Sequence, residues 1–267
     1  MMTKEQIDLF NTFGFIKFPG LFREDMDALS AEFEHVFRRF YGPAVQDGKQ
    51  RRAIAPFLDQ SETLCSLLED PRIDGILTSL LGEDYNYMGS DGNYYSGETP
   101  WHPDGSNSYR HLKLAFYFDE LDGSTGALRV IPGSHRHADV FGTQLLEKCK
   151  NPLESWGISG SEVPAYVLNV DPGDVLVFDH STLHSSWGGG KHRRMLAINA
   201  CERYRTSDIQ QFREYLTLHH TYQNAAPIYY GDRMVAGGGA RRAKHLEQVL
   251  ANTDHLKANP VLSEHAG

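Results

Sequence analysis

Residues 171–184 read Asp-Pro-Gly-Asp-Val-Leu-Val-Phe-Asp-His-Ser-Thr-Leu-His. A Pro-Gly-Asp turn followed by an apolar run is typical of a strand in a β-sheet protein. If this strand persists, Phe178, His180 and His184 lie on one face, because successive side chains alternate between the two faces of a strand. Polar side chains that follow an apolar strand on one face indicate a lined cavity. The segment therefore predicts a β core with two candidate cavity histidines, His180 and His184.

Short β-prone runs, separated by Gly, Pro and Asp, continue on both sides of this segment. They cover residues 93–95, 112–118, 127–131, 163–170 and 195–201. Repeated short strands with turn signals between them indicate a sandwich or jelly roll. We expect a double-stranded β-helix core of the jelly-roll, cupin-like type. An insert at about 141–160 has its own helical pattern, and we expect it to cover one mouth of the sheet.

The chain on either side of this core has helical periodicity. Apolar residues recur at helical spacing over 3–14, 24–40 and 70–82, and a polar tail ends in an expected solvated helix over 241–257. We therefore expect a mainly β protein with flanking helices at both ends. The expected organisation is a single domain, residues 1–267, with a helical N-terminal part (about 1–83), the jelly-roll core (about 84–204) and a helical tail (about 205–267).

The composition narrows the class of protein. The 267 residues include 26 basic and 35 acidic side chains, which gives a net charge of −9. A nucleic-acid partner would require a basic face, so we expect none, and the acidic balance gives no reason to expect an anionic membrane surface. The start has no apolar signal segment, and no run of about 18 apolar residues is long enough for a membrane span.

The cysteines are few and far apart in the sequence. There are three of them, Cys65, Cys149 and Cys201. An odd number at such spacing is typical of reduced thiols and not of a disulfide framework, so we expect a cytoplasmic protein.

A candidate metal motif lies in Trp101-His102-Pro103-Asp104-Gly105. His102 and Asp104 can offer an imidazole nitrogen and a carboxylate oxygen to one divalent ion such as Fe(II). The alternative is a capped turn in which Asp104 accepts hydrogen bonds from backbone N–H groups near Gly105. A facial triad requires one further ligand, for which His180 and His184 are the candidates.

A candidate anion site opens the last strand of the core. Arg193 and Arg194 precede the apolar run 195–198. A guanidinium at the start of a buried strand costs free energy unless a carboxylate meets it, and a dicarboxylate co-substrate would serve. Alternation predicts that one of the two arginines points inward. The alternative is a solvated strand end, which the neighbouring Lys191 and His192 would suit.

Taken together, these motifs resemble the phytanoyl-CoA dioxygenase family of Fe(II)/2-oxoglutarate oxygenases. The likeness runs through Trp101–Gly105, Gly126–His135, Pro172–Asp179, His184–Ser186 and Arg193–Arg194. The run Gly-Ala-Leu-Arg-Val-Ile-Pro-Gly-Ser-His at 126–135 is a strong signal for the family, although it does not indicate which substrate is used.

The resemblance implies a set of site residues. The Fe(II) ligands would be His102, Asp104 and His184, where a small residue and Ser follow the distal His. Arg193 and Ser186 would hold the distal carboxylate of 2-oxoglutarate. The chain departs from the family pattern at Ser185, where Gly is common, and again at Trp187-Gly188-Gly189-Gly190, where a loop containing Asn is common. The 2-oxoglutarate end of the pocket is therefore expected to differ in detail.

The resemblance also implies an enzyme. It would use dioxygen and 2-oxoglutarate to hydroxylate or otherwise oxidise a small-molecule substrate, with release of succinate and carbon dioxide. Because Asp104 is present, the resemblance favours hydroxylation over halogenation. Candidate substrate contacts are Asn107 and Arg110, which follow the His102–Asp104 pair, and Arg129, which alternatively pairs with an acid. A solvated turn is the alternative for the first two.

Two other functions fit parts of the pattern. A cupin-type dioxygenase or isomerase would not use 2-oxoglutarate, but its iron site usually has more histidines and a Glu, and it would not require Arg193. A non-catalytic jelly-roll protein that binds a small molecule would have no reason to keep costly polar groups inside. The sequence has no basic cluster that would recognise the phosphates of coenzyme A.

Overall fold

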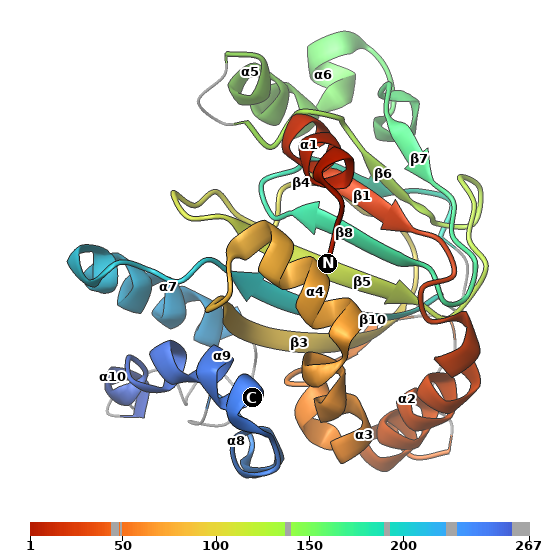
Figure 1. Ribbon diagram of the computed structural model, residues 1–267. Helices are drawn as coiled ribbons and strands as arrows, with labels where there is room; N and C mark the ends of the chain where they lie inside the picture. The colour runs from red at the N-terminus through yellow and green to blue at the C-terminus, as the bar shows by residue number, and fades with distance from the viewer. Residues whose placement is uncertain (44–47, 49, 137–139, 190–192, 223–228, 258–267) are drawn as a thin grey trace.

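The computed structural model describes residues 1–43, 48, 50–136, 140–189, 193–222 and 229–257 (Figure 1). Two antiparallel sheets face each other, with strand orders β1-β8-β5-β10-β3-β2 and β4-β9-β6-β7. The larger sheet consists of β1 (Phe15–Phe18), β2 (Arg52–Ile54), β3 (Asn86–Tyr95), β5 (His111–Tyr117), β8 (Val175–Asp179) and β10 (Arg193–Cys201). The smaller sheet consists of β4 (Thr99–His102), β6 (Leu128–Val130), β7 (Tyr166–Leu168) and β9 (His184–Ser186).

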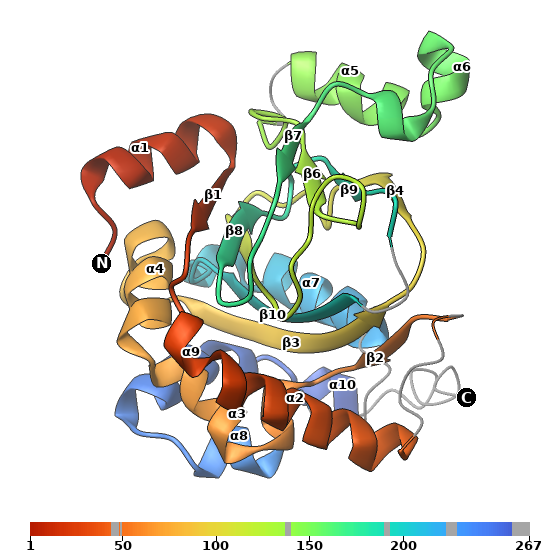
Figure 2. The ribbon, with the colours of Figure 1, turned by 90° about the vertical axis from the view of Figure 1, so that its right-hand side faces the viewer.

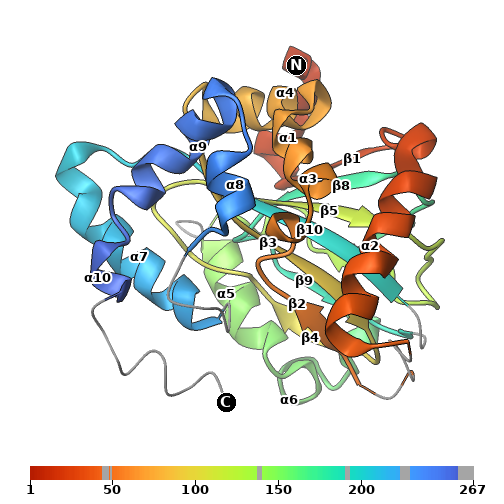
Figure 3. The same ribbon diagram turned by 90° about the horizontal axis from the view of Figure 1, so that it is seen from below.

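Most helices from both ends of the chain lie on the outer side of the larger sheet, whereas the first helix lies beside the edge strand β1 (Figures 2 and 3). The N-terminal helices are α1 (Lys4–Phe13), α2 (Met26–Tyr41), α3 (Glu62–Cys65) and α4 (Pro71–Leu81). The C-terminal helices are α7 (Ile209–Tyr222), α8 (Asp232–Ala236), α9 (Ala240–Leu250) and α10 (Asp254–Lys257). Single 3₁₀ turns cover Arg23–Asp25, Leu58–Gln60, Ser66–Glu69, Gly160–Glu162 and Thr206–Asp208.

Strand alternation divides the interior into two cores. On β10, Leu196 and Ile198 join the core between the larger sheet and the helices, whereas Met195 and Ala197 join the core between the two sheets. The strand is hydrophobic on both faces because both faces are covered. The inner core leaves room for the polar groups that line the cavity between the sheets.

The expected jelly-roll core with flanking helices is confirmed, although helices take a larger share of the chain than the description "mainly β" implies. The expected helix near the start is also present. Thr3 and Gln6 form the capping box of α1, and Gly14 ends the helix with a left-handed backbone (φ 83°) that favours glycine.

Two local expectations are wrong, and the condition placed on a third is not met. The strand that contains Phe178 does not persist to His184, because Asp179 ends β8. Its side chain accepts a hydrogen bond from the Ser181 N–H (2.9 Å), and its carbonyl accepts one from Thr182 (2.9 Å). The chain turns here and enters the smaller sheet, so the two histidines lie on different structural elements.

The other two differences concern the insert and the tail. Helices α5 (Val140–Cys149) and α6 (Pro152–Trp156) lie beyond the smaller sheet (Figure 2), where Cys149 packs with Trp101 and Leu183 on its outer face, not over a mouth. The expected solvated helix over 241–257 is divided into α9 and α10, and α9 buries Leu246 and Val249 against the core. Among the described residues, no helix is long and apolar enough to cross a membrane.

Candidate active site

Two histidines face each other across neighbouring strands of the smaller sheet. His102 on β4 pairs in register with His184 on β9, and their ring centroids are 4.3 Å apart. The Nδ1 atom of His102 lies 2.8 Å from the carbonyl oxygen of Pro100, and that of His184 lies 2.9 Å from the carbonyl oxygen of Thr182. A carbonyl oxygen can only accept a hydrogen bond, so each Nδ1 carries the proton and each Nε2 has a free lone pair for a metal.

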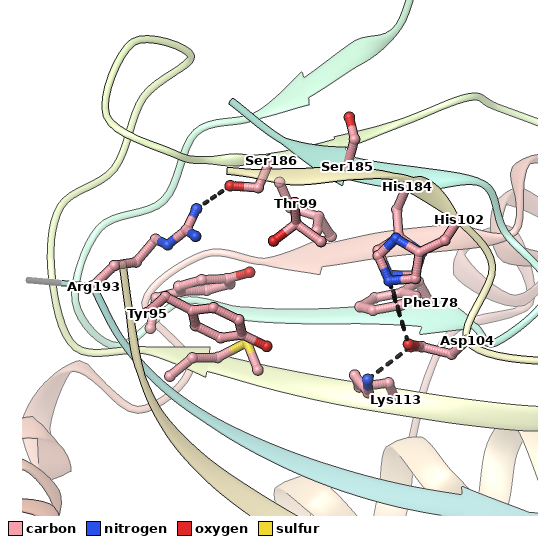
Figure 4. Close-up of a pocket in the computed structure, with 13 residues that line it drawn as sticks. Tyr95, Thr99, His102, Asp104, Lys113, Phe178, His184, Ser185, Ser186 and Arg193 are labelled. Carbon is pink, nitrogen blue, oxygen red and sulfur yellow. Dashed lines mark hydrogen bonds and ion pairs between the residues drawn. The ribbon is translucent and has the colours of Figure 1, made fainter. Parts of the chain in front are cut away.

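A carboxylate completes the cluster. Oδ1 of Asp104 lies 3.9 Å from Nε2 of His102 and 3.8 Å from Nε2 of His184. One ligand atom from each of the three residues lies within 4.8 Å of the other two. Figure 4 shows the three side chains converging at one end of a pocket, with Lys113 on the far side of the carboxylate. Two imidazoles and one carboxylate form the donor set of a facial triad, which suits Fe(II).

The charges in the cluster favour metal binding. Burial lowers the pKa of His184 to about 4, so its imidazole is neutral at physiological pH. Burial alone would raise the pKa of Asp104, but the charge of the neighbouring Lys113 ammonium outweighs burial and holds this pKa well below its usual range. Asp104 is therefore ionised, and neither Asp104 nor His184 needs to lose a proton when a metal binds.

A guanidinium occupies the opposite end of the same pocket (Figure 4). Arg193 is 3% exposed, donates to the carbonyl of Gly126 (2.6 Å), and contacts the hydroxyl of Ser186. Its carbon Cζ lies 4.9 Å from the centroid of the Tyr95 ring. Among the described residues, no carboxylate lies within 4 Å of this guanidinium, and its Nε has no hydrogen-bond partner. A buried cation with neutral partners alone is suited to receive an anion.

The pocket joins these two ends. Its lining consists of Tyr95, Thr99, His102, Asp104, Lys113, Tyr117, Leu128, Phe178, His184, Ser185, Ser186, Arg193 and Met195. The predicted set His102, Asp104, His184, Arg193 and Ser186 therefore lies in one cavity. The residues predicted from the sequence did not include four others that line the pocket, Lys113, Thr99, Tyr95 and Tyr117. A signal existed for Lys113, because it is the one charged residue within the apolar run 112–118.

The two alternative candidates, Arg194 and His180, do not line this pocket. Arg194 points to the opposite face of β10, where it pairs with Asp119 (2.7 Å) and Glu34 (3.1 Å). His180 is buried outside the triad, and its Nε2 lies 3.2 Å from Oδ1 of Asn199.

The three candidate substrate residues do not line this pocket. Asn107 and Arg110 border a separate polar cleft that also includes Glu202 and Asp179. Arg129 donates to the carbonyl oxygens of Ser161 (2.6 Å) and Gly123 (2.9 Å). It does not line the cavity, and it pairs with no acid in the described part of the chain. Its neighbours Leu128 and Val130 belong to the inner core, which turns Arg129 outward by alternation.

Comparisons with known proteins agree with this architecture. The family model described as phytanoyl-CoA dioxygenase (PhyH) matches residues 10–195. A search among curated proteins finds no match.

Three solved structures illustrate the likeness to known folds. The carbocyclase SnoK of nogalamycin biosynthesis, described as non-heme and alpha-ketoglutarate-dependent, is 21% identical over 79% of this chain and 90% of its own, with a TM-score of 0.59. HygX from Streptomyces hygroscopicus, with nickel and 2-oxoglutarate bound, is 18% identical over 77% and 89%, with a TM-score of 0.61. EctD from S. alaskensis, in its apoform, is 23% identical over 75% and 77%, with a TM-score of 0.56. At these identities the likeness establishes the shared fold.

Proposed function

The chain belongs to the phytanoyl-CoA dioxygenase family of Fe(II)/2-oxoglutarate oxygenases, and we propose that it oxidises a small-molecule substrate with release of succinate and carbon dioxide. One observation carries the proposal. A single pocket has a His-Asp-His cluster at one end and, at the other, a buried guanidinium with no carboxylate partner among the described residues. This is the arrangement that a metal and a dicarboxylate would fill together.

The metal would be held by His102, Asp104 and His184. Their Nε2, Oδ1 and Nε2 atoms face one another, and both Nδ1 atoms are fixed by backbone carbonyls. Fe(II) with 2-oxoglutarate would supply the oxidising chemistry when both are bound. The three side chains would bind one face of the ion and leave its other coordination positions open. The structure of HygX with nickel and 2-oxoglutarate bound supports this assignment by analogy.

The co-substrate would lie along the pocket with its distal carboxylate at Arg193. A guanidinium can donate two parallel hydrogen bonds to a carboxylate, and burial strengthens the attraction. Ser186 contacts the same guanidinium and lies opposite Thr99 in the β4–β9 ladder, so either hydroxyl is placed to contribute. Gly126 lies beside Arg193 and has no side chain, which leaves room for the carboxylate of 2-oxoglutarate to approach the guanidinium.

The substrate is proposed only as a small molecule. HygX has been crystallised with hygromycin B, and the similar structures include a carbocyclase and an epimerase. The proposal therefore includes oxidations other than hydroxylation. Asn107 and Arg110 border a separate cleft, so a substrate that reaches them must also extend to the triad.

The test is an anaerobic titration of the Fe(II)-loaded protein with 2-oxoglutarate, followed by the weak visible metal-to-ligand charge-transfer band. We expect a band in the wild type and in the matched control His180→Ala, whose side chain is buried outside the triad. We expect no band in His184→Ala. Absence of the band in the wild type would refute the proposal. If the wild type gave no band but still bound 2-oxoglutarate, the result would indicate a non-catalytic binding protein.

A further inference from the structure

The carboxylate of the triad is held differently from the two histidines. His102 and His184 lie on paired strands, where the ladder fixes their positions. Asp104 follows the end of β4 and lies on irregular backbone. Its N–H donates to the carbonyl of His180 (2.7 Å), and the N–H of Gly105 donates to the same oxygen (3.2 Å). These bonds fix the backbone of Asp104 but leave the rotation of its side chain free.

Lys113 fixes that rotation from the opposite sheet. It lies on β5, in register with Asn199 of β10 and Phe178 of β8, so its side chain emerges on the inner face of the larger sheet. Its Nζ lies 2.7 Å from Oδ2 of Asp104 and 5.9 Å from the centroid of the Phe178 ring. Both members of the ion pair are mostly buried, with side-chain exposures of 17% and 18%.

The two oxygens of the carboxylate therefore have different neighbours. Oδ1 faces the Nε2 atoms of His102 and His184, whereas Oδ2 faces the ammonium of Lys113. A carboxylate can bind a metal through one oxygen or through both. If Oδ2 swung toward the ion, it would leave a buried ammonium without its partner and would occupy a position that the co-substrates require.

We propose that Lys113 is a positioning residue that holds Asp104 in one-oxygen coordination and thereby keeps the remaining metal positions open. The inference rests on the proposed function and adds a residue of the larger sheet to a metal centre whose three ligands come from the smaller sheet and its adjoining loop. Groups that orient a metal ligand commonly change metal affinity by about 10- to 100-fold when they are removed.

The test compares Lys113→Met, Lys113→Gln and Lys113→Arg in the full-length protein. Fe(II) affinity is measured anaerobically by competition with a chelator, and 2-oxoglutarate affinity is measured by the charge-transfer band. We expect Lys113→Met to change the Fe(II) Kd by at least about tenfold and to raise the Kd of 2-oxoglutarate. Lys113→Arg, which keeps the charge, should restore both toward the wild-type values, and Lys113→Gln should be intermediate.

A matched control separates positioning from general stabilisation. Lys17→Met removes another Lys–Asp ion pair of 2.7 Å, in which the carboxylate is buried and the lysine partly exposed, and which joins β1 to Asp174 away from the pocket. It should lower the melting temperature and leave both affinities unchanged. If Lys113→Met does not fold, the Gln and Arg variants carry the comparison.

The outcomes distinguish this inference from the proposed function. Wild-type affinities for both ligands in a folded Lys113→Met or Lys113→Gln protein would overturn the positioning role, even with a normal wild-type band. A wild type that binds Fe(II) but gives no band would refute the proposed function, and the Fe(II) affinities alone would then decide the role of Lys113.

Discussion

Arg193 and Arg194 are neighbours on β10, and their guanidinium groups lie on opposite faces of the larger sheet. Arg193 points into the pocket and has neutral partners, the carbonyl of Gly126 and the hydroxyl of Ser186. Arg194 points toward the helices and has two carboxylate partners, Asp119 and Glu34. Arg194 therefore has its counter-charge within the described protein, whereas Arg193 has no carboxylate partner among the described residues, which is the basis of the proposed anion site.

This difference predicts opposite effects for two identical substitutions. Arg193→Met should raise the Kd of 2-oxoglutarate by about 30-fold or more, because truncating one partner of a buried charge pair costs about 2 kcal/mol or more. Arg194→Met should leave that Kd unchanged and lower the free energy of unfolding by about 1 kcal/mol, since its ion pairs are partly exposed. Binding titrations and chemical denaturation measure the two effects. Equal Kd values for the two variants would contradict the assignment.

Gly126 controls the position of Arg193. Its backbone is left-handed (φ 100°), and an added Cβ would collide with Nη1 of Arg193. Gly157→Ala is a matched control, because Gly157 is also left-handed (φ 70°) but a Cβ there would meet no described atom within 4 Å. Both substitutions should destabilise the protein by about 1–2 kcal/mol through backbone strain.

Gly126→Ala alone should weaken 2-oxoglutarate binding, because the collision displaces the guanidinium. Calorimetric titration with 2-oxoglutarate measures this effect on the two folded variants. An unchanged Kd in Gly126→Ala would show that Arg193 does not hold the co-substrate in its described position.

Sequence patterns predicted the strands of the core better than they predicted which side chains meet. Alternation required one inward arginine but could not select between Arg193 and Arg194, and the family resemblance made that choice. His180 and His184 posed the same problem. They are four residues apart, so alternation places both on the same face of a strand. The turn after Asp179 that separates them depends on a side-chain hydrogen bond.

Contacts between the two sheets could not be predicted from the sequence. Lys113 stands out as a charge within an apolar run, but its partner Asp104 lies on a loop after a strand of the other sheet. No periodicity links the two positions. The outward direction of Arg129 could, by contrast, have been predicted from the sequence, because Leu128 and Val130 on either side are apolar and occupy the inner face.

A buried carboxyl group outside the pocket predicts how stability changes with pH. Asp59 is 6% exposed. Its Oδ1 accepts a hydrogen bond from the Gly231 N–H (2.5 Å), and its Oδ2 has no hydrogen-bond partner among the described residues. Burial raises the pKa of Asp59 from 3.8 to about 6. The folded protein therefore binds more protons than the unfolded chain between these two values, and this group makes stability fall as pH rises through that window, by about 3 kcal/mol in all.

Asp59→Asn should remove this penalty, because the amide oxygen can still accept from Gly231 and the side chain cannot ionise. We expect the variant to be more stable than the wild type at pH 7.5, by about 1–3 kcal/mol, and the difference to vanish near pH 4. The control Asp174→Asn should behave in the opposite way. Burial alone would raise the pKa of Asp174, but its bond to Lys17 lowers it, so this carboxylate stabilises the fold at neutral pH. Urea denaturation at both pH values measures the differences, and a less stable Asp59→Asn at pH 7.5 would show that the ionised carboxylate is favourable where it lies.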